Sequence, residues 1–333
     1  MNSAREVLVQ VSHLSVAFPS ATGSIPVVDD VSFEIRRGAI LGLVGESGSG
    51  KSVTSLAVMG LVGAKGGKVQ SGSVELDGQE LLRLSQREWA SVRGDRIGMI
   101  FQQPTRCLNP AFTVGAQIAE TLRRHEKVSR KAAWSRAISM LDRVGIPNAS
   151  ERARAFPHQW SGGMCQRAMI AQALICEPDL LIADEPTTAL DPTVQARILD
   201  LLRDIQRETG IAILLITHDL GVIADMADDI AVMYAGQIVE KGRAEVVLTK
   251  PLNPYTQALI QAVPAEGVTE LRAIPGTAPQ PDGRPLGCRF APRCEFAQSQ
   301  CREPGAELVV KMPQLGHLTR CVRADELQLG SVS

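Results

Sequence analysis

Short apolar runs recur along the chain, and turn or polar residues bound each of them. Residues 40–44 (ILGLV), 180–183 (LLIA) and 211–216 (IAILLI) are continuous apolar segments. Segments of this length are typical of strands buried on both faces, as in the centre of a parallel sheet. We therefore predict three central strands at these positions.

Other segments show longer patterns. Residues 7–18 and 27–35 are predicted to be strands with a loop between them, and residues 231–242 a hairpin. Residues 114–146 carry apolar side chains at helical spacing, and residues 53–59 can open a helix. Alternating strands and helices predict an α/β domain.

The composition of the chain changes after about residue 255. From there the sequence is rich in proline and loop-like, and it carries Cys288, Cys294, Cys301 and Cys321 close together. We place a domain boundary at this point. Residues 1–255 are predicted to form the body, and residues 256–333 a short loop-rich extension with a four-cysteine cluster.

Charge and hydropathy exclude several classes of protein. The 333 residues carry a formal net charge of −1, so no overall basic field favours nucleic acid. No apolar run approaches the roughly 18 residues of a membrane helix, and the N-terminus lacks the apolar core of a secretory signal. The chain is expected in the cytosol, where its seven cysteines would be reduced, metal-bound or catalytic.

Residues 45–52 (GESGSGKS) fit the phosphate-binding pattern G-x-x-x-x-G-K-[ST]. They lie between a predicted strand and a predicted helix, which is the context that this loop needs. Its glycines let successive N–H groups point inward, and the helix N-terminus adds partial positive charge. Lys51 can reach terminal phosphates and Ser52 can bind Mg²⁺. A chance match in a glycine-rich turn is the alternative.

Acidic residues follow the apolar run 180–183 directly. Asp184 suits the shell of a Mg²⁺ ion, and Glu185 can act as a general base toward water. His218 follows the next predicted strand, so it is expected at the same edge of the sheet, where it could donate a hydrogen bond to a γ-phosphate. An acidic loop and a surface histidine are the alternatives.

A second anion-binding helix start is predicted at residues 160–167 (WSGGMCQR), ahead of an apolar helix-like run. Ser161, Gly162 and Gly163 offer free N–H groups there, although a plain N-cap has the same pattern. One nucleotide rarely needs two such cradles from one subunit. The second helix start is therefore expected to serve a nucleotide that another subunit holds.

Taken in order along residues 7–250, these motifs resemble the ATP-binding subunit of an ABC transporter. Residues 45–52 resemble Walker A, 160–167 the signature, 180–185 Walker B, and 189–191 the D-loop. The resemblance implies a mixed sheet core, an antiparallel β subdomain and a helical subdomain at about 103–175. The resemblance also implies roles for single residues. Catalysis is assigned to Glu185, His218 and Gln102, and Mg²⁺ binding to Ser52, Gln102 and Asp184. Signature contacts are assigned to Ser161, Gly162, Gly163 and Met164, and a D-loop role to Asp191. The residues implied to bind the nucleotide are Phe18, Gly45, Glu46, Ser47, Gly48, Ser49, Gly50, Lys51, Ser52 and Val53.

Further stretches look like the oligopeptide, dipeptide and nickel uptake branch of that family, among them residues 183–191 (ADEPTTALD), 253–256 (NPYT) and the cysteine tail. This resemblance implies an ATPase that powers import of peptides or related small solutes. It implies two permease subunits, a second ATP-binding subunit that is a paralogue (a heterodimer), and an extracytoplasmic solute-binding protein. The expected location is the cytoplasmic face of the inner membrane. Gln102 and the segment 103–120 are expected to meet a permease helix.

Two positions depart from the family signature, which usually has Leu where this chain has Trp160 and Arg where it has Cys165. Neither replaces Ser161, Gly162 or Gly163, so phosphate binding should survive. The lost arginine charge could alter contacts of the signature helix.

The four C-terminal cysteines could hold an iron–sulfur cluster or Zn²⁺. Their spacing fits neither a common ferredoxin pattern nor a zinc C-x₂-C motif. The family resemblance implies a [4Fe–4S] cluster, which we favour over Zn²⁺. His317 could replace one thiolate in a zinc site, but an exposed loop histidine is the simpler expectation.

Two other classes of function compete with transport. ABC ATPases of DNA repair or translation usually carry two nucleotide domains or large inserted modules, and neither is seen here. A regulatory module that holds ATP without hydrolysing it is disfavoured by the intact Glu185 and His218. The sequence does not name the transported solute.

Overall fold

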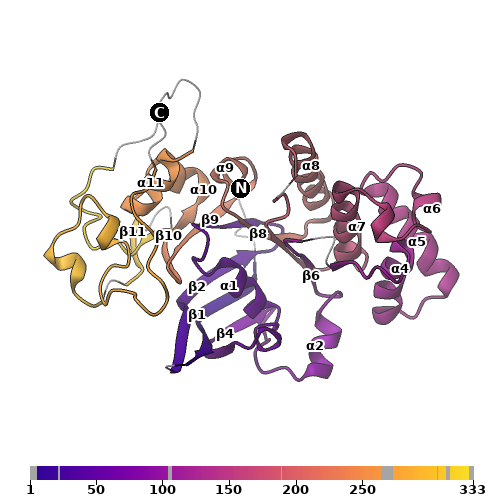
Figure 1. Ribbon diagram of the computed structural model, residues 1–333, viewed down its shortest axis with the longest axis horizontal. Helices are drawn as coiled ribbons and strands as arrows, with labels where there is room; N and C mark the ends of the chain where they lie inside the picture. Colours follow the sequence, from indigo (N-terminus) through magenta and orange to yellow (C-terminus); the bar gives the residue numbers. More distant parts are fainter. Residues whose placement is uncertain are drawn as a thin grey trace. The chain divides into compact units, whose positions relative to one another are not determined.

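The computed structural model describes residues 6–21, 23–103, 107–188, 190–263, 273–305, 307–312 and 316–329 (Figure 1). The chain forms two compact units, and each is described by itself. One unit comprises residues 83–214 with the N-terminal residues 1–6, and is called the helical unit below. The other comprises residues 7–82 and 215–333, and is called the P-loop unit.

The P-loop unit contains a four-stranded antiparallel sheet in the order β2-β1-β4-β5. In β1 most side chains on one face are buried, as expected for a sheet with one face on the core. The loop predicted between the first two strands is instead a tight connection, because Ser20 pairs with Gly23. The strands are β1 (Val7–Ser20), β2 (Gly23–Arg36), β4 (Lys68–Leu76) and β5 (Gln79–Glu80).

A second sheet region in the P-loop unit carries the phosphate loop. Strand β3 (Ile40–Val44) runs parallel to β9 (Asp229–Tyr234), which pairs antiparallel with β10 (Gln237–Arg243). These strands confirm the predicted buried run and the predicted hairpin. Helices α1 (Lys51–Val58), α9 (Leu220–Met226), α10 (Ala244–Thr249) and α11 (Pro254–Gln261) belong to the same unit, with the 3₁₀ turn η1 (Gly63–Lys65).

The C-terminal extension continues this second sheet. Strand β12 (His317–Thr319) pairs antiparallel with β10, and β11 (Val309–Met312) pairs with β12. Two 3₁₀ turns, η3 (Ala291–Arg293) and η4 (Ser299–Arg302), precede these strands. Beyond α11, the described part of the extension therefore adds two strands to the sheet of the body and otherwise has short 3₁₀ turns and loops.

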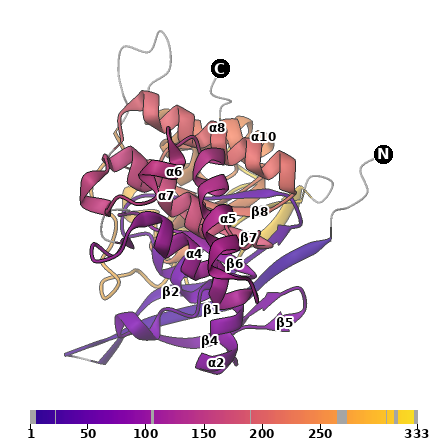
Figure 2. The ribbon, with the colours of Figure 1, turned by 90° about the vertical axis from the view of Figure 1, so that its right-hand side faces the viewer.

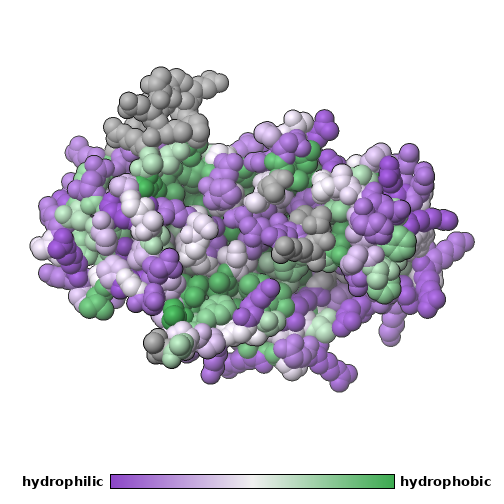
Figure 3. All heavy atoms as spheres, viewed as in Figure 1, coloured by the Kyte–Doolittle hydropathy of each residue, from purple (hydrophilic) through white to green (hydrophobic). Residues whose placement is uncertain are grey.

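The helical unit is built on two parallel strands, β6 (Ile97–Ile100) and β7 (Leu180–Asp184), whose residues are all buried. Figure 2 shows α4 to α7 grouped within this unit, and their surface is largely hydrophilic in Figure 3. The predicted helical stretch 114–146 is split into α4 and α5. The helices are α2 (Gln86–Val92), α4 (Val114–His125), α5 (Arg130–Arg143), α6 (Ala149–Arg152), α7 (Gly162–Leu174) and α8 (Pro192–Thr209), with the 3₁₀ turn η2 (Pro157–Gln159).

The third predicted central strand is β8 (Ala212–Thr217), which runs across the boundary between the units and is buried throughout. Among the described residues, no helix combines the length and the apolar character that a membrane crossing requires.

Candidate active site

Residues 45–50 form a turn that only glycine tolerates at key points. Gly45, Gly48 and Gly50 have φ values of 151°, 78° and 107°. A Cβ at Gly45 would meet the carbonyl oxygen of Met233 at 2.0 Å. The pattern of glycines in the sequence is therefore required by backbone conformation and by close packing on β9.

The turn opens directly into α1, whose N-cap is Gly50. The buried Lys51 donates from Nζ to the carbonyl oxygens of Gly45 and Glu46, at 2.7 and 3.0 Å. Ser52 is exposed at the first turn of the helix. A curled loop, a lysine folded over it and a helix N-terminus together form a phosphate cradle.

Glu46 is tied to two residues of the C-terminal part of the chain. Its N–H donates to the hydroxyl of Tyr255 at 2.9 Å. Its Oε2 accepts from Nη1 of Arg293 at 2.9 Å, in an ion pair whose Arg293 side chain is only 7% exposed. Burial lowers the pKa of Arg293, but hydrogen bonds to Glu46 and Tyr234 outweigh that effect and the pKa lies above its ordinary value. This ion pair links the extension to the phosphate cradle.

Two further predicted residues lie in the P-loop unit. Phe18 is half-buried near the end of β1, and its ring packs against Gly67, where a Cβ would approach the ring to 2.7 Å. His218 follows β8 directly and is exposed. The side chain of the next residue, Asp219, caps α9 by accepting from Gly221 and Val222.

In the helical unit, Gln102 and Glu185 are in direct contact. Nε2 of Gln102 donates to Oε2 of Glu185 at 2.7 Å, and the hydroxyl of Thr188 donates to the same oxygen at 2.8 Å. Glu185 has a φ of 48°, a left-handed conformation that non-glycine residues seldom adopt. Strained backbone of this kind is typical of functional sites. Asp184, at the end of β7, is buried.

The second predicted helix start is also observed. Ser161 is the N-cap of α7, and its hydroxyl accepts from the N–H of Met164 at 3.3 Å. Ser161 and Gly162 are exposed, and a Cβ at Gly162 would meet nothing within 4 Å. The helix start is therefore open to an anion from outside this chain. Nε2 of Gln166 joins the same helix to the segment after β7, donating to the carbonyl of Pro186 at 2.6 Å.

The D-loop and the unusual signature residues have local structural roles. Asp191 is exposed and caps α8 by accepting from the N–H of Val194 at 3.0 Å. Trp160 and Cys165 are buried, and burial raises the pKa of the Cys165 thiol. Part of the predicted permease-facing segment and Ala189 lie outside the described residues.

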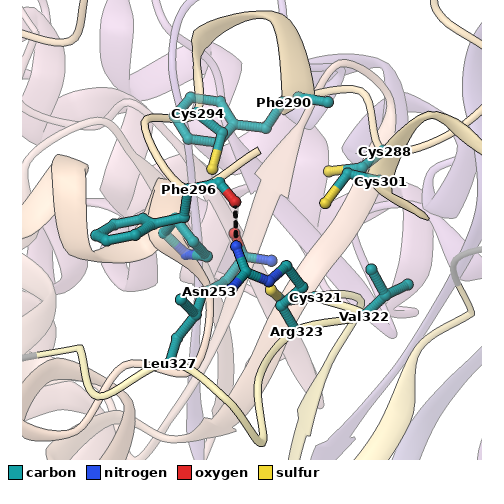
Figure 4. A pocket seen from close by; sticks show the side chains of 12 residues that line it. Asn253, Cys288, Phe290, Cys294, Phe296, Cys301, Cys321, Val322, Arg323 and Leu327 are labelled. Atoms are coloured by element: carbon teal, nitrogen blue, oxygen red, sulfur yellow. Dashed lines mark hydrogen bonds between the residues drawn. The ribbon is translucent and has the colours of Figure 1, made fainter. Parts of the chain in front are cut away.

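The four C-terminal cysteines line one cavity together with Asn253, Pro254 and Phe290 (Figure 4). Cys288 and Cys301 lie side by side, while Cys294 and Cys321 approach from other directions. Burial raises the pKa of the thiols of Cys288 and Cys294, and that of Cys321 to about 11. Within the described residues, no group of three or more His, Cys, Asp and Glu side chains is arranged to hold a single metal ion.

His317 is not the exposed loop residue that the sequence suggested. It lies in β12, is fully buried, and its Nε2 is 2.7 Å from Oε1 of Glu240, which is also fully buried. Glu240 accepts in addition from the N–H groups of Leu252 and Asn253. His317 therefore anchors the extension to β10.

Comparison with known proteins agrees with this geometry. A family model described as ABC transporter matches residues 28–188, and one described as oligopeptide/dipeptide transporter, C-terminal region, matches residues 239–301. The dipeptide transport ATP-binding protein DppD of Bacillus subtilis (strain 168) is 50% identical over 298 residues, covering 89% of each chain. The chain belongs to the ATP-binding proteins of ABC transporters.

Other relatives support the same assignment over nearly the whole chain. The oligopeptide transport ATP-binding protein AppD of B. subtilis (strain 168) is 45% identical over 321 residues, covering 96% of this chain and 97% of AppD. A dimeric post-hydrolysis structure of the ATP-binding cassette MJ0796 bound to ADP and Pi has a TM-score of 0.65 and 27% identity, covering 71% of this chain and 99% of that chain. This ABC protein is thus an ATPase whose ATP hydrolysis drives transport.

Thr188, Tyr255 and Arg293 hold the candidate motifs in place, but the sequence did not predict these roles. Thr188 follows Glu185 by three residues, and its hydroxyl donates to the Glu185 carboxylate. Tyr255 and Arg293 contact Glu46 from 209 and 247 positions away, so spacing along the sequence could not reveal them.

Proposed function

We propose that this ABC protein hydrolyses ATP at an interface between two ATP-binding subunits and so powers peptide import. The hydrogen bond from Gln102 to Glu185 is the observation that supports the catalytic part of this proposal, because it orients the carboxylate of a residue with left-handed backbone directly after β7. In this proposal ATP lies on residues 45–53 with Phe18 against adenine. Ser52, Gln102 and Asp184 would hold a Mg²⁺ ion, which when bound would offset phosphate charge.

The proposed step is attack of water on the γ-phosphorus. Glu185 aligns the water and accepts its proton, the bond from the γ-phosphorus to the bridging oxygen breaks, and ADP leaves with that electron pair. His218 donates to the γ-phosphate. Ser161, Gly162, Gly163 and Met164 bind the γ-phosphate of the ATP on the other subunit, with Asp191 beside that interface. Loss of the bridging phosphate then opens the dimer.

The names of the relatives support the choice of cargo. DppD and AppD are named for dipeptide and oligopeptide transport. We propose two permease subunits, a paralogous second ATP-binding subunit, and an extracytoplasmic binding protein that delivers the peptide. The chain would lie at the cytoplasmic face of the cell membrane, with residues 1–255 as the ATP-binding domain and 256–333 as its extension.

Reconstitution of the full transporter in vesicles tests this function. Uptake of a labelled dipeptide should require ATP on the side of this subunit and should stop in the Glu185→Gln variant. Uptake that continues at the parent rate in that variant would refute the role given to Glu185. Copurification of nucleic acid in place of permease subunits would favour the competing class of ABC ATPases.

A separate observation supports a metal cluster in the extension. The thiols of Cys288, Cys294, Cys301 and Cys321 all line one cavity. Four thiolates suit either an iron–sulfur cluster or Zn²⁺. We propose a [4Fe–4S] cluster rather than Zn²⁺, following the family resemblance. When bound, the cluster would tie these loop segments together.

Anaerobic purification decides between these metals. A brown protein with about four iron and four sulfide per chain is expected, and the Cys288→Ser variant should lose both. A colourless protein with one zinc per chain would support the alternative, and a protein without metal would exclude both.

A further inference from the structure

The ion pair between Glu46 and Arg293 joins the phosphate loop to the cysteine cavity. Arg293 precedes Cys294, which lines that cavity, and the paired residues are 247 positions apart in the sequence. The guanidinium is held in place by one residue of the extension and by one residue of β9. Its Nε donates to the carbonyl of Pro275 at 2.7 Å, and its Nη1 to the hydroxyl of Tyr234 at 3.3 Å.

The same two regions share a second contact through aromatic residues. Tyr255, which accepts from the N–H of Glu46, follows Pro254 in the wall of the cavity. Phe290 also lies in that wall, and its ring centroid is 5.3 Å from that of Tyr255 and 5.4 Å from that of Tyr234. The loop is thus braced by one partly buried ion pair and by one hydrogen bond to a packed aromatic cluster.

The charges of Glu46 and Arg293 bear on how well the phosphate loop binds ATP. Glu46 places a carboxylate in a loop that binds a polyphosphate, and like charges in such a site repel. Its Oε2 is neutralised by Arg293, whereas its Oε1 is buried and has no hydrogen-bond partner in the part of the chain that the structure describes. Without Arg293 the carboxylate would keep its full charge beside the phosphates.

We propose that Arg293 is a positioning residue for ATP binding: it neutralises Glu46 and holds it back so that the phosphate loop accepts the triphosphate. This proposal deepens the function proposed above and rests on it. The loops around the four cysteines also carry the Arg293 guanidinium. The proposal therefore implies that ATP affinity depends on how well these loops are ordered.

Calorimetric titration of ATP and ADP tests the proposal. The parent is the Glu185→Gln full-length chain, which should bind ATP without consuming it. Arg293→Gln, which removes the charge at similar size, should weaken ATP binding about tenfold and ADP binding less. Arg293→Lys keeps the charge and should stay within about threefold of the parent.

The decisive variant combines Arg293→Gln with Glu46→Gln. Removing both charges should restore ATP affinity to within about threefold of Glu46→Gln alone. A merely structural role for Arg293 predicts no such rescue. Arg320→Gln is the matched control, since this buried arginine pairs with Asp30 in β2 instead of the phosphate loop, and it should change affinity less than about twofold.

Three results would overturn the proposal: unchanged ATP affinity in Arg293→Gln, a double variant as weak as Arg293→Gln, or an equal loss in Arg320→Gln. Failure of the parent chain to bind ATP at all would instead count against the proposed function. The thermal midpoint of each variant, measured in parallel, separates misfolding from loss of binding.

Discussion

The side-chain amide of Gln102 donates a 2.7 Å hydrogen bond to Oε2 of Glu185. The two residues follow neighbouring parallel strands in which Ile100 pairs with Ala183, so each lies two positions beyond its paired partner. The register of β6 and β7 therefore brings them together.

Replacement of Glu185 by Gln should separate ATP binding from turnover. The amide keeps the size of the side chain but cannot accept the proton of the attacking water. We expect ATP affinity within about threefold of wild type and a loss of turnover of at least about a hundredfold, measured by phosphate release. Turnover near the wild-type rate would remove Glu185 from the mechanism.

The signature can be tested without disturbing the isolated chain. Gly162 is exposed and has open space at its Cβ position. Gly162→Glu should therefore fold normally and bind ATP on residues 45–53, but its carboxylate should repel the other subunit's γ-phosphate and reduce turnover at least about tenfold. Gly63→Glu is the control, because Gly63 also has nothing within 4 Å. Equal activity of both variants would contradict the role of the signature.

Gly45→Ala should abolish ATP binding. Its Cβ would lie 2.0 Å from the carbonyl oxygen of Met233, at a φ of 151°. The loop cannot keep its shape under that overlap. Gly66→Ala provides the control for backbone strain alone, since Gly66 has a φ of 80° and open space around it. ATP titrations should show far weaker binding by Gly45→Ala than by Gly66→Ala. Similar ATP affinities of the two variants would show that the chain relieves the clash with Met233.

Breaking the buried pair of Glu240 and His317 should strongly destabilise the P-loop unit. Glu240→Ala removes the partner of a buried imidazole and of two backbone N–H groups. A loss of about 3–5 kcal/mol in unfolding free energy is expected from denaturant titration. Glu245→Ala, at an exposed position of α10, should cost less than about 0.5 kcal/mol. A small effect at Glu240 would mean that the extension is not anchored there.

Thiol reactivity should follow burial and pKa. Burial raises the pKa of Cys176 to about 11, so its thiolate fraction at pH 8 is very small and grows as the pH approaches that value. Cys107 is exposed and should be alkylated first by a short pulse of iodoacetamide at pH 8. Mass spectrometry at pH 7, 8 and 9 should show that Cys176 is labelled more slowly than Cys107 and that its labelling rate rises with pH. Equal labelling rates of the two cysteines at pH 8 would contradict the burial of Cys176.

The phosphate loop was predictable because every requirement is local. The strand Ile40–Val44, the glycines and helix α1 are consecutive in the sequence, and the positive φ values demand those glycines. Gln102 could be named only from the family resemblance, because its contact with Glu185 depends on the pairing of β6 with β7.

The role of the extension could not be predicted, because long-range contacts define it. Strands β11 and β12 are short and follow a proline-rich stretch that gives no periodic signal. The burial of His317 depends on Glu240, 77 positions earlier, and the Arg293–Glu46 pair spans 247 positions. Composition could indicate only that the segment is loop-rich.

The central claim is that ATP is held between two subunits and that its hydrolysis separates them. Light scattering of the Glu185→Gln chain, mixed with its second ATP-binding subunit, measures this directly. With ATP and Mg²⁺ the molar mass should rise to that of two subunits, and the added Gly162→Glu change should prevent it. A single-chain mass under all conditions, together with full ATPase activity of the separated wild-type chain, would contradict the account.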